Sequence, residues 1–197
     1  MKSGKLTRFN LRAVTAALAS LVVLGGLGVG IYANAATLTN GTSTATVVRP
    51  ITISQTTPLS FGRFSTPDTA GGGTVTIEAS EAGVRGKSGG VVLIDSASGG
   101  IGAKGNSGVC LVSGEGGLTY TVSALTASNL TRSGGGAAMT LVISTAPAAV
   151  GTGTGVLSGA ATELGTQTLY VGGVLTVAAA QTPGTYTGTY SVTVEYN

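Results

Sequence analysis

Two glycine-containing motifs of the chain have spacings that could hold phosphate groups. Gly86-Lys87-Ser88 resembles the end of a phosphate-binding loop, but the first glycine of such a loop would fall at Glu81, whose carboxylate would repel phosphates. Gly100–Gly105 matches the glycine spacing of a dinucleotide-binding loop, yet residues 106–112 predict a strand where the pyrophosphate needs a helix N-terminus. We therefore expect a plain turn at Gly86–Ser88 and no nucleotide site at either motif.

Catalytic and metal-binding residue types are scarce. The chain has no histidine, which removes the commonest general base, the usual serine and cysteine hydrolase triads and the main zinc ligand. Glu78 and Glu81 could form a carboxylate pair, but at this spacing beside a strand they point to different faces, so we interpret them as solvated loop acids. Asp68, Asp95 and Glu115 stand isolated, whereas a carboxylate metal site needs clustered ligands. The sequence thus predicts no enzyme, with no catalytic residues, no cofactor and no metal.

The first 35 residues have the layout of a secretory signal peptide. Basic residues come first, an apolar run follows from Ala13 to Ile31, and the small-x-small site Ala33-Asn34-Ala35 precedes Ala36. We expect a helix in this leader and cleavage after Ala35, which leaves no membrane span. A retained membrane anchor is the alternative, because the apolar run is nearly long enough to cross a bilayer.

Export changes how the charge and the single cysteine are interpreted. Four of the ten Lys and Arg residues leave with the leader, so six remain against seven Asp and Glu, a net charge of about −1. No basic stripe with interleaved aromatic residues is left, so nucleic-acid binding is not expected. Cys110 cannot form a disulfide within the chain, and its neighbours Val109 and Leu111 favour a small buried hydrophobe over a reactive thiol.

The composition predicts a single all-β domain after the leader. Only 9% of the residues are charged, while threonine and valine recur in short apolar runs separated by some of the 34 glycines, which suit tight turns. About 162 residues are enough for one core. Strands are expected at residues 44–53, 59–64, 74–79, 90–95, 107–112, 119–124, 138–144, 167–177 and 185–196. Residues 145–165 are expected to form a loop with a short edge strand.

The end of the chain has the clearest strand pattern. Alternate positions carry large side chains on one face and hydroxyls or a carboxylate on the other. The first face holds Tyr186, Tyr190, Val192, Val194 and Tyr196, and the second holds Thr187, Thr189, Ser191, Thr193 and Glu195. Because successive strand residues point to opposite faces, this period of two predicts a half-buried strand whose solvent-exposed face is rich in threonine.

Several segments together resemble a known family. They are residues 44–54, the Leu59–Phe64 element, residues 171–177 and residues 183–190. The chain resembles a family of uncharacterised bacterial secreted domains, the domain-of-unknown-function family numbered 4402, which is similar to the spore coat protein U domain and to chaperone–usher pilin subunits. Pilin subunits typically carry a glycine fourteen residues from the C-terminus and a penultimate tyrosine, and this chain has Gly184 and Tyr196 there.

The pilin resemblance implies an immunoglobulin-like β-sandwich at residues 49–197 that lacks its final strand. A periplasmic chaperone would lend that strand first, and the N-terminal extension of another fibre subunit would replace it at the outer-membrane usher, so that the protein passes through the periplasm to the cell surface. The donor would be residues 36–48, with Leu38, Ser43, Ala45 and Val47 facing inward. The strand from Tyr186 to Tyr196, with Gly184 before it, would form one wall of the acceptor groove.

Two function classes therefore remain open. The first is a structural subunit of a surface fibre or pilus, and it is motivated by the export signal, the strand-rich chain and the Gly184 and Tyr196 ending. The second is a secreted monomeric surface or matrix protein, in which the last strand simply closes a complete sandwich. An unfilled groove beside the last strand would favour the first class.

Overall fold

The computed structural model describes residues 40–66, 71–95, 104–151 and 153–197. The chain divides into two units, residues 1–44 and residues 45–197. Of the first unit only residues 40–44 are described, and they are exposed and have no regular structure. The expected leader with Ala33 and Ala35, and also Ala36 and Leu38, lie outside the described residues.

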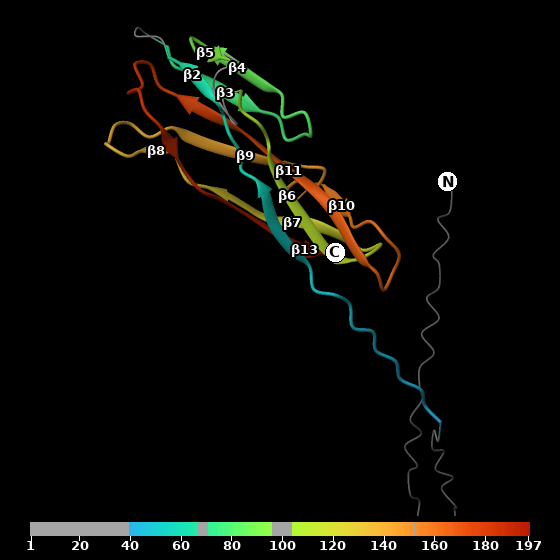
Figure 1. Ribbon diagram of the computed structural model, residues 1–197. Helices are drawn as coiled ribbons and strands as arrows, with labels where there is room; N and C mark the ends of the chain where they lie inside the picture. The colour runs from blue at the N-terminus through green and yellow to red at the C-terminus, as the bar shows by residue number, and fades with distance from the viewer. Residues whose placement is uncertain (1–39, 67–70, 96–103, 152) are drawn as a thin grey trace, which may run out of the picture. The chain divides into compact units, whose positions relative to one another are not determined.

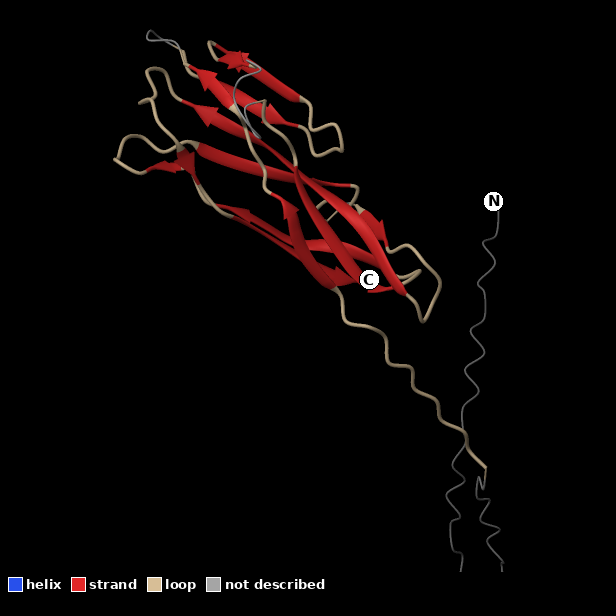
Figure 2. Cartoon of the chain, viewed as in Figure 1, coloured by secondary structure: helices blue, strands red, loops and turns tan. Residues whose placement is uncertain are grey.

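All the regular elements within these described ranges are β-strands (Figures 1 and 2), which confirms the all-β prediction. None of the described residues belongs to a helix long and apolar enough to cross a membrane. Every pairing between the named strands is antiparallel.

The largest sheet has six strands and is organised around one long strand. Its members are β1 (Thr52–Thr57), β6 (Gly108–Glu115), β11 (Leu164–Val177), β3 (Gly73–Ile77), β4 (Arg85–Gly89) and β9 (Thr140–Ala146). β11 pairs with β6 through residues 164–171 and with β3 through residues 173–177. Because Tyr170 and Val171 pair with β6 and also with β9, those two strands lie on opposite edges of β11.

The remaining strands form three small sheets. In the first, β7 (Thr119–Ala127) lies between β10 (Thr154–Val156) and β13 (Tyr190–Tyr196). β8 (Thr131–Arg132) pairs with β12 (Tyr186–Thr187), and β2 (Arg63–Ser65) pairs with β5 (Val92–Ile94). β13 therefore has β7 on one edge, and no second strand is paired with it in the described part of the chain.

The core consists of two clusters of apolar side chains. The first joins the six-stranded sheet to the β10-β7-β13 sheet and contains Cys110, Val112, Leu169 and Val171 from one side and Tyr120, Val122 and Val194 from the other. The second contains Val75, Ile77, Leu141, Leu175 and Val177 from β3, β9 and β11, with Phe61, Val91 and Met139 over them. Cys110 is 4% exposed, and burial raises the pKa of its thiol, as expected for a small core hydrophobe.

Sequence predictions for the first strand and for Gly86–Ser88 differ from the structure. The first strand begins at Thr52 instead of residue 44, because residues 45–48 are exposed and have no pairing strand. Gly86–Ser88 is not a turn: it lies inside β4 and pairs with residues 74–76 of β3. Residues 100–103 of the second glycine motif lie outside the described residues.

The predicted C-terminal strand is two strands separated by Gly188 and Thr189. At the break, the Ser128 hydroxyl accepts the Thr189 N–H at 2.8 Å, and the Ser128 N–H donates to the Thr189 carbonyl at 2.8 Å. A side chain therefore replaces one backbone partner where the C-terminal segment passes from pairing with β8 to pairing with β7. The expected alternation holds along β13, where Val194 is buried while Thr193 and its alternate neighbours are exposed.

Candidate functional site

A groove of about 1380 Å³ runs between the beginning and the end of the folded unit. Its N-terminal wall consists of Ile53, Gln55, residues 58–66 and Ile94, and its C-terminal wall consists of residues 180–190 and Val192. Its floor consists of Cys110, Leu130, Met139, Leu141 and Leu175. The groove thus opens onto the second core cluster and reaches the edge of the first.

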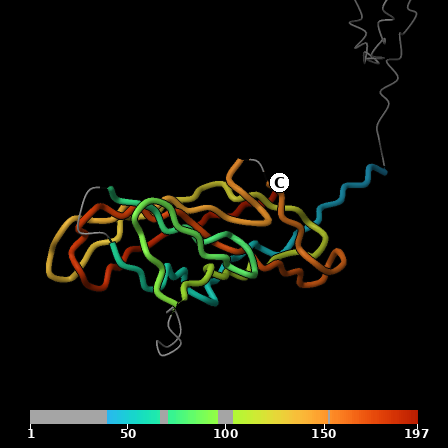
Figure 3. Tube along the Cα trace, turned by 90° about the horizontal axis from the view of Figure 1, so that it is seen from above, coloured from blue at the N-terminus to red at the C-terminus, as the bar shows by residue number. Residues whose placement is uncertain are grey.

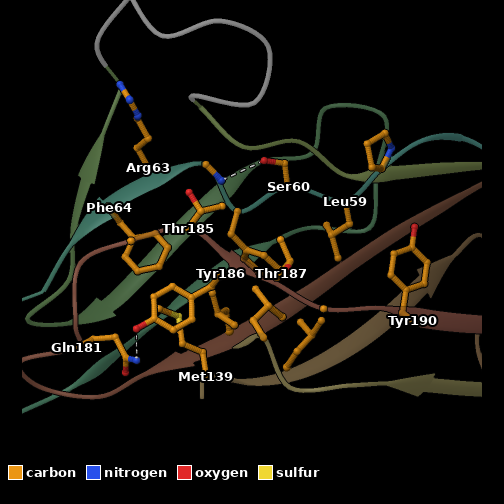
Figure 4. A pocket seen from close by; sticks show the side chains of 18 of the residues that line it. Leu59, Ser60, Arg63, Phe64, Met139, Gln181, Thr185, Tyr186, Thr187 and Tyr190 are labelled. Carbon is orange, nitrogen blue, oxygen red and sulfur yellow. Dashed lines mark hydrogen bonds between the residues drawn. The ribbon is translucent and has the colours of Figure 1, made fainter. Parts of the chain in front are cut away.

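Large side chains from both walls point into this groove. Figure 4 shows Phe64 from the N-terminal wall and Tyr186 from the C-terminal wall turned toward the same part of it. Both side chains pack at the edge of the second core cluster, to which Met139 of the floor belongs. The floor is apolar, while the walls mix aromatic and aliphatic side chains with the hydroxyl and amide groups of Ser, Thr and Gln residues, and Arg63 is the one formally charged member among the described residues.

The groove separates two strand edges that face each other. β1 pairs with β6 on one edge and β13 pairs with β7 on one edge, and no backbone pairing joins β1 to β13 in the described ranges. Side chains cross the gap at two levels: Gln55 Nε2 donates to the Tyr190 hydroxyl at 2.6 Å, and the Tyr196 hydroxyl donates to the Arg49 carbonyl at 2.9 Å. The two strands therefore run antiparallel, with their free edges turned toward the same gap.

Free strand edges beside apolar surface have a defined chemistry. Each edge presents a row of backbone N–H and C=O groups without ladder partners, which makes it a template for another extended segment. An inserted strand would gain main-chain hydrogen bonds from an edge and would bury alternate side chains in the groove. The arrangement can bind an extended polypeptide without any catalytic group.

A polar clamp closes one end of the gap. The Glu115 carboxylate, in a residue only 8% exposed, accepts the Arg49 N–H at 3.2 Å and the Thr162 N–H at 2.6 Å. The Tyr196 hydroxyl accepts the Glu115 N–H at 2.7 Å while it donates to the Arg49 carbonyl. Arg49 is thus held through both of its backbone polar groups, and Figures 1 and 3 place the C-terminus beside this start of the folded unit.

The predicted C-terminal residues have three different positions. Gly184, Tyr186, Tyr190 and Val192 line the groove, whereas Val194 belongs to the first core cluster and Tyr196 forms the clamp. Gly184 has φ +152°, a backbone conformation that favours glycine, and a side chain there would meet Arg132. Burial raises the pKa of the Tyr190 phenol, and the nearby Cys110 thiol adds to the increase, so this hydroxyl stays neutral in the groove.

The predicted donor residues are exposed where the structure describes them. Ser43, Ala45 and Val47 are all exposed, and the Val47 side chain is 96% exposed. Leu38 lies outside the described residues. Glu78 and Glu81 are also exposed, as expected of solvated acids, and the described ranges hold no group of three residues that could bind a metal.

Sequence reasoning missed the N-terminal wall and the floor as parts of the site. Residues 59–64 were expected to form one strand, but in the structure residues 58–62 precede β2 and carry Leu59 and Phe61 along the groove. Phe61 and Phe64 are two of the three phenylalanines in the chain. Their placement in one short segment was the available signal for an aromatic lining.

Comparisons with known proteins give one positive result. Neither a comparison with curated proteins nor a comparison with solved structures gives a match. One family model matches residues 51–196, which include all thirteen strands described above. The chain therefore belongs to the family described as Domain of unknown function (DUF4402).

Proposed function

We propose that this protein is a structural subunit of a bacterial surface fibre, an immunoglobulin-like sandwich that lacks one strand and receives it from a partner. A periplasmic chaperone supplies the strand first, and another subunit supplies it at the outer-membrane usher. The observation that carries the proposal is the groove with an apolar floor, which runs between residues 58–66 and residues 180–190 and reaches the unpaired edges of β1 and β13. The expected export signal and the resemblance to pilin subunits agree with it.

The size and lining of the groove favour a polypeptide over a small ligand. Pockets for small molecules span about 300 to 1000 Å³, whereas this groove has about 1380 Å³. Its length follows β12 and β13 from Tyr186 to Val192, which is the shape of an extended segment. Such a segment would cover the apolar floor, whose exposure in an isolated subunit favours aggregation.

The chain also carries a candidate donor. Residues 40–48 precede the clamp at Arg49, are exposed and belong to no strand. In the proposed fibre, residues 36–48 insert into the groove of a neighbour, while the groove of this subunit takes the extension of another. Acceptor and donor then lie at separate places in one chain, which is the requirement for a linear polymer.

The test compares two aspartate variants at neighbouring positions of β13. Val192 faces the groove and Thr193 faces solvent, so Val192→Asp places a charge in an apolar site and Thr193→Asp does not. We expect Val192→Asp to abolish fibres on the cell surface, scored by electron microscopy of labelled protein, and Thr193→Asp to retain them. Equal effects of the two variants would contradict the assignment of the groove face.

Deletion of residues 36–48 separates the role of this chain as strand donor from its role as strand acceptor. The shortened chain should still receive a strand but should no longer supply one, so it should terminate fibres when it is co-expressed with the full chain. A shortened chain that is recovered as a stable soluble monomer without any chaperone would count against an open groove.

A secreted monomer that does not polymerise is the second candidate. The hydrogen bond from Gln55 to Tyr190 and the clamp from Tyr196 to Arg49 cross the gap and favour it, because they join the two edges within one molecule. Electron microscopy of sheared cell surfaces with labelled protein distinguishes the candidates. Filaments favour the fibre subunit, and a diffuse signal in the supernatant favours the monomer.

A further inference from the structure

The extension of this chain has few large side chains to place in a groove. In an extended segment alternate residues share one face. Positions 37, 39, 41, 43, 45 and 47 hold Thr, Thr, Gly, Ser, Ala and Val, and positions 38, 40, 42, 44, 46 and 48 hold Leu, Asn, Thr, Thr, Thr and Val. Either face therefore presents mainly small or hydroxyl-bearing side chains.

The groove is lined by large side chains that need large partners to fill the space between them. Aromatic rings of Phe61, Phe64, Tyr186 and Tyr190 line its walls, and Met139 and three leucines form most of its floor. Protein interiors are packed as densely as organic crystals, and atoms that face an unfilled gap lose their dispersion contacts. A strand with glycine, serine and alanine facing inward would leave much of the 1380 Å³ unfilled.

We infer that the groove takes its strand from a different polypeptide, an extended uncharged segment with large aliphatic or aromatic side chains at alternate positions. This inference rests on the proposed function. The extension of this chain then fits a shallower groove on another subunit, so the protein joins two unlike neighbours and does not polymerise with itself. Its place in the fibre is a junction between subunits of different types.

Peptide binding to the full chain, expressed with its own leader and purified from the periplasm, tests this inference. The first probe is a labelled peptide of residues 36–48. The second is the same peptide with Gly41→Ile, Ser43→Leu and Ala45→Phe, which enlarges the three central inward positions. Each large apolar side chain moved from water into the groove adds about tenfold in affinity, so the second peptide should bind at least about 100-fold more tightly by fluorescence anisotropy.

A matched control is the enlarged peptide with Thr42→Pro and Thr44→Pro, which keeps the three large side chains but removes two backbone N–H donors. It should bind at least about tenfold less tightly than the enlarged peptide. An equal affinity for this control would overturn the inference, because binding would then follow overall hydrophobicity instead of strand addition in the groove.

The remaining outcomes separate the inference from the proposed function. If the unmodified peptide binds as tightly as the enlarged one, the inference fails and the strand-accepting groove stands. If no peptide binds, both fail. Binding of the enlarged peptide should be lost in the Val192→Asp chain and retained in the Thr193→Asp chain, and loss in neither variant would show binding outside the groove and overturn the inference.

Discussion

Removal of the Tyr196 hydroxyl is the most direct test of the clamp that closes the gap between β1 and β13. Tyr196→Phe keeps the ring and deletes one oxygen, which accepts the Glu115 N–H at 2.7 Å and donates to the Arg49 carbonyl at 2.9 Å. The two bonds differ in consequence because Glu115 is buried and Arg49 is exposed. Water can replace the hydroxyl at the Arg49 carbonyl, but the Glu115 N–H is left without a partner.

The expected loss follows from that one buried donor. A buried polar group that loses its only partner costs about 1–3 kcal/mol, and we expect Tyr196→Phe to lower the free energy of unfolding by about 2 kcal/mol. For a folded unit of this size, that corresponds to a decrease in Tm of about 4–8 °C. Urea denaturation should show a lower midpoint with an unchanged slope, since the surface exposed on unfolding does not change.

Tyr170→Phe is the matched control. Tyr170 lies on β11, and its side chain makes no hydrogen bond within the described residues, so the same deletion there should change stability by less than about 0.5 kcal/mol. Gly114→Ala disrupts the clamp in a second way, because its new methyl group would collide with the Tyr196 hydroxyl. The two clamp variants should be less than additive when combined. If Tyr196→Phe and Tyr170→Phe shift the midpoint equally, the clamp is not a stabilising element.

Three further predictions concern the core and the N-terminal wall. Burial raises the pKa of Tyr120 to about 12, so the stability that this neutral phenol contributes is intact below pH 10 and is lost as the pH rises toward 12. At about pH 11 the loss should be about 1.4 kcal/mol in urea titrations, and Tyr120→Phe should not show it. Gly155→Ala should destabilise by about 1–3 kcal/mol in the same assay, because its methyl group would overlap the Tyr120 ring. Arg85 is 6% exposed in its side chain and donates to the Phe61 carbonyl at 3.0 Å, so Arg85→Met should cost about 1–3 kcal/mol. Asp95→Asn should cost under about 1 kcal/mol, since the Asp95 side chain of that ion pair is 59% exposed.

Local alternation of apolar and polar residues predicted the strands that have one solvent-exposed face. The alternation in residues 190–196 matches the burial of β13 residue by residue, and the central parts of β3, β6, β7, β9 and β11 were also expected. A period of two is visible in the sequence wherever one face of a strand packs on the core and the other meets water. The all-β prediction also rested on the composition, with threonine and valine recurring in short runs separated by glycines.

Elements whose position is set by distant partners could not be predicted. β4 carries Gly86-Lys87-Ser88, which has the composition of a turn, and it becomes a strand because its backbone completes the edge beside β3. Residues 45–48 have the composition of a strand but find no partner edge, so they stay exposed and belong to no strand. Strand formation in both segments depends on tertiary pairing, which local propensity does not determine.

The spacing of the C-terminal tyrosines explains how an apolar groove can stay open. Each ring contributes apolar surface, while each hydroxyl reaches a polar partner away from the groove centre. The Tyr186 hydroxyl donates to the Thr182 carbonyl at 2.8 Å, the Tyr190 hydroxyl accepts from the Gln55 side chain, and the Tyr196 hydroxyl binds the clamp. Leucine at these positions would supply the same apolar character without polar anchors, and the walls could then collapse onto the floor. Only the Tyr190 and Tyr196 hydroxyls reach across the gap, to Gln55 and Arg49, whereas the Tyr186 hydroxyl bonds within its own wall. The two edges are therefore joined at two levels by polar contacts, without close packing of the apolar floor between them.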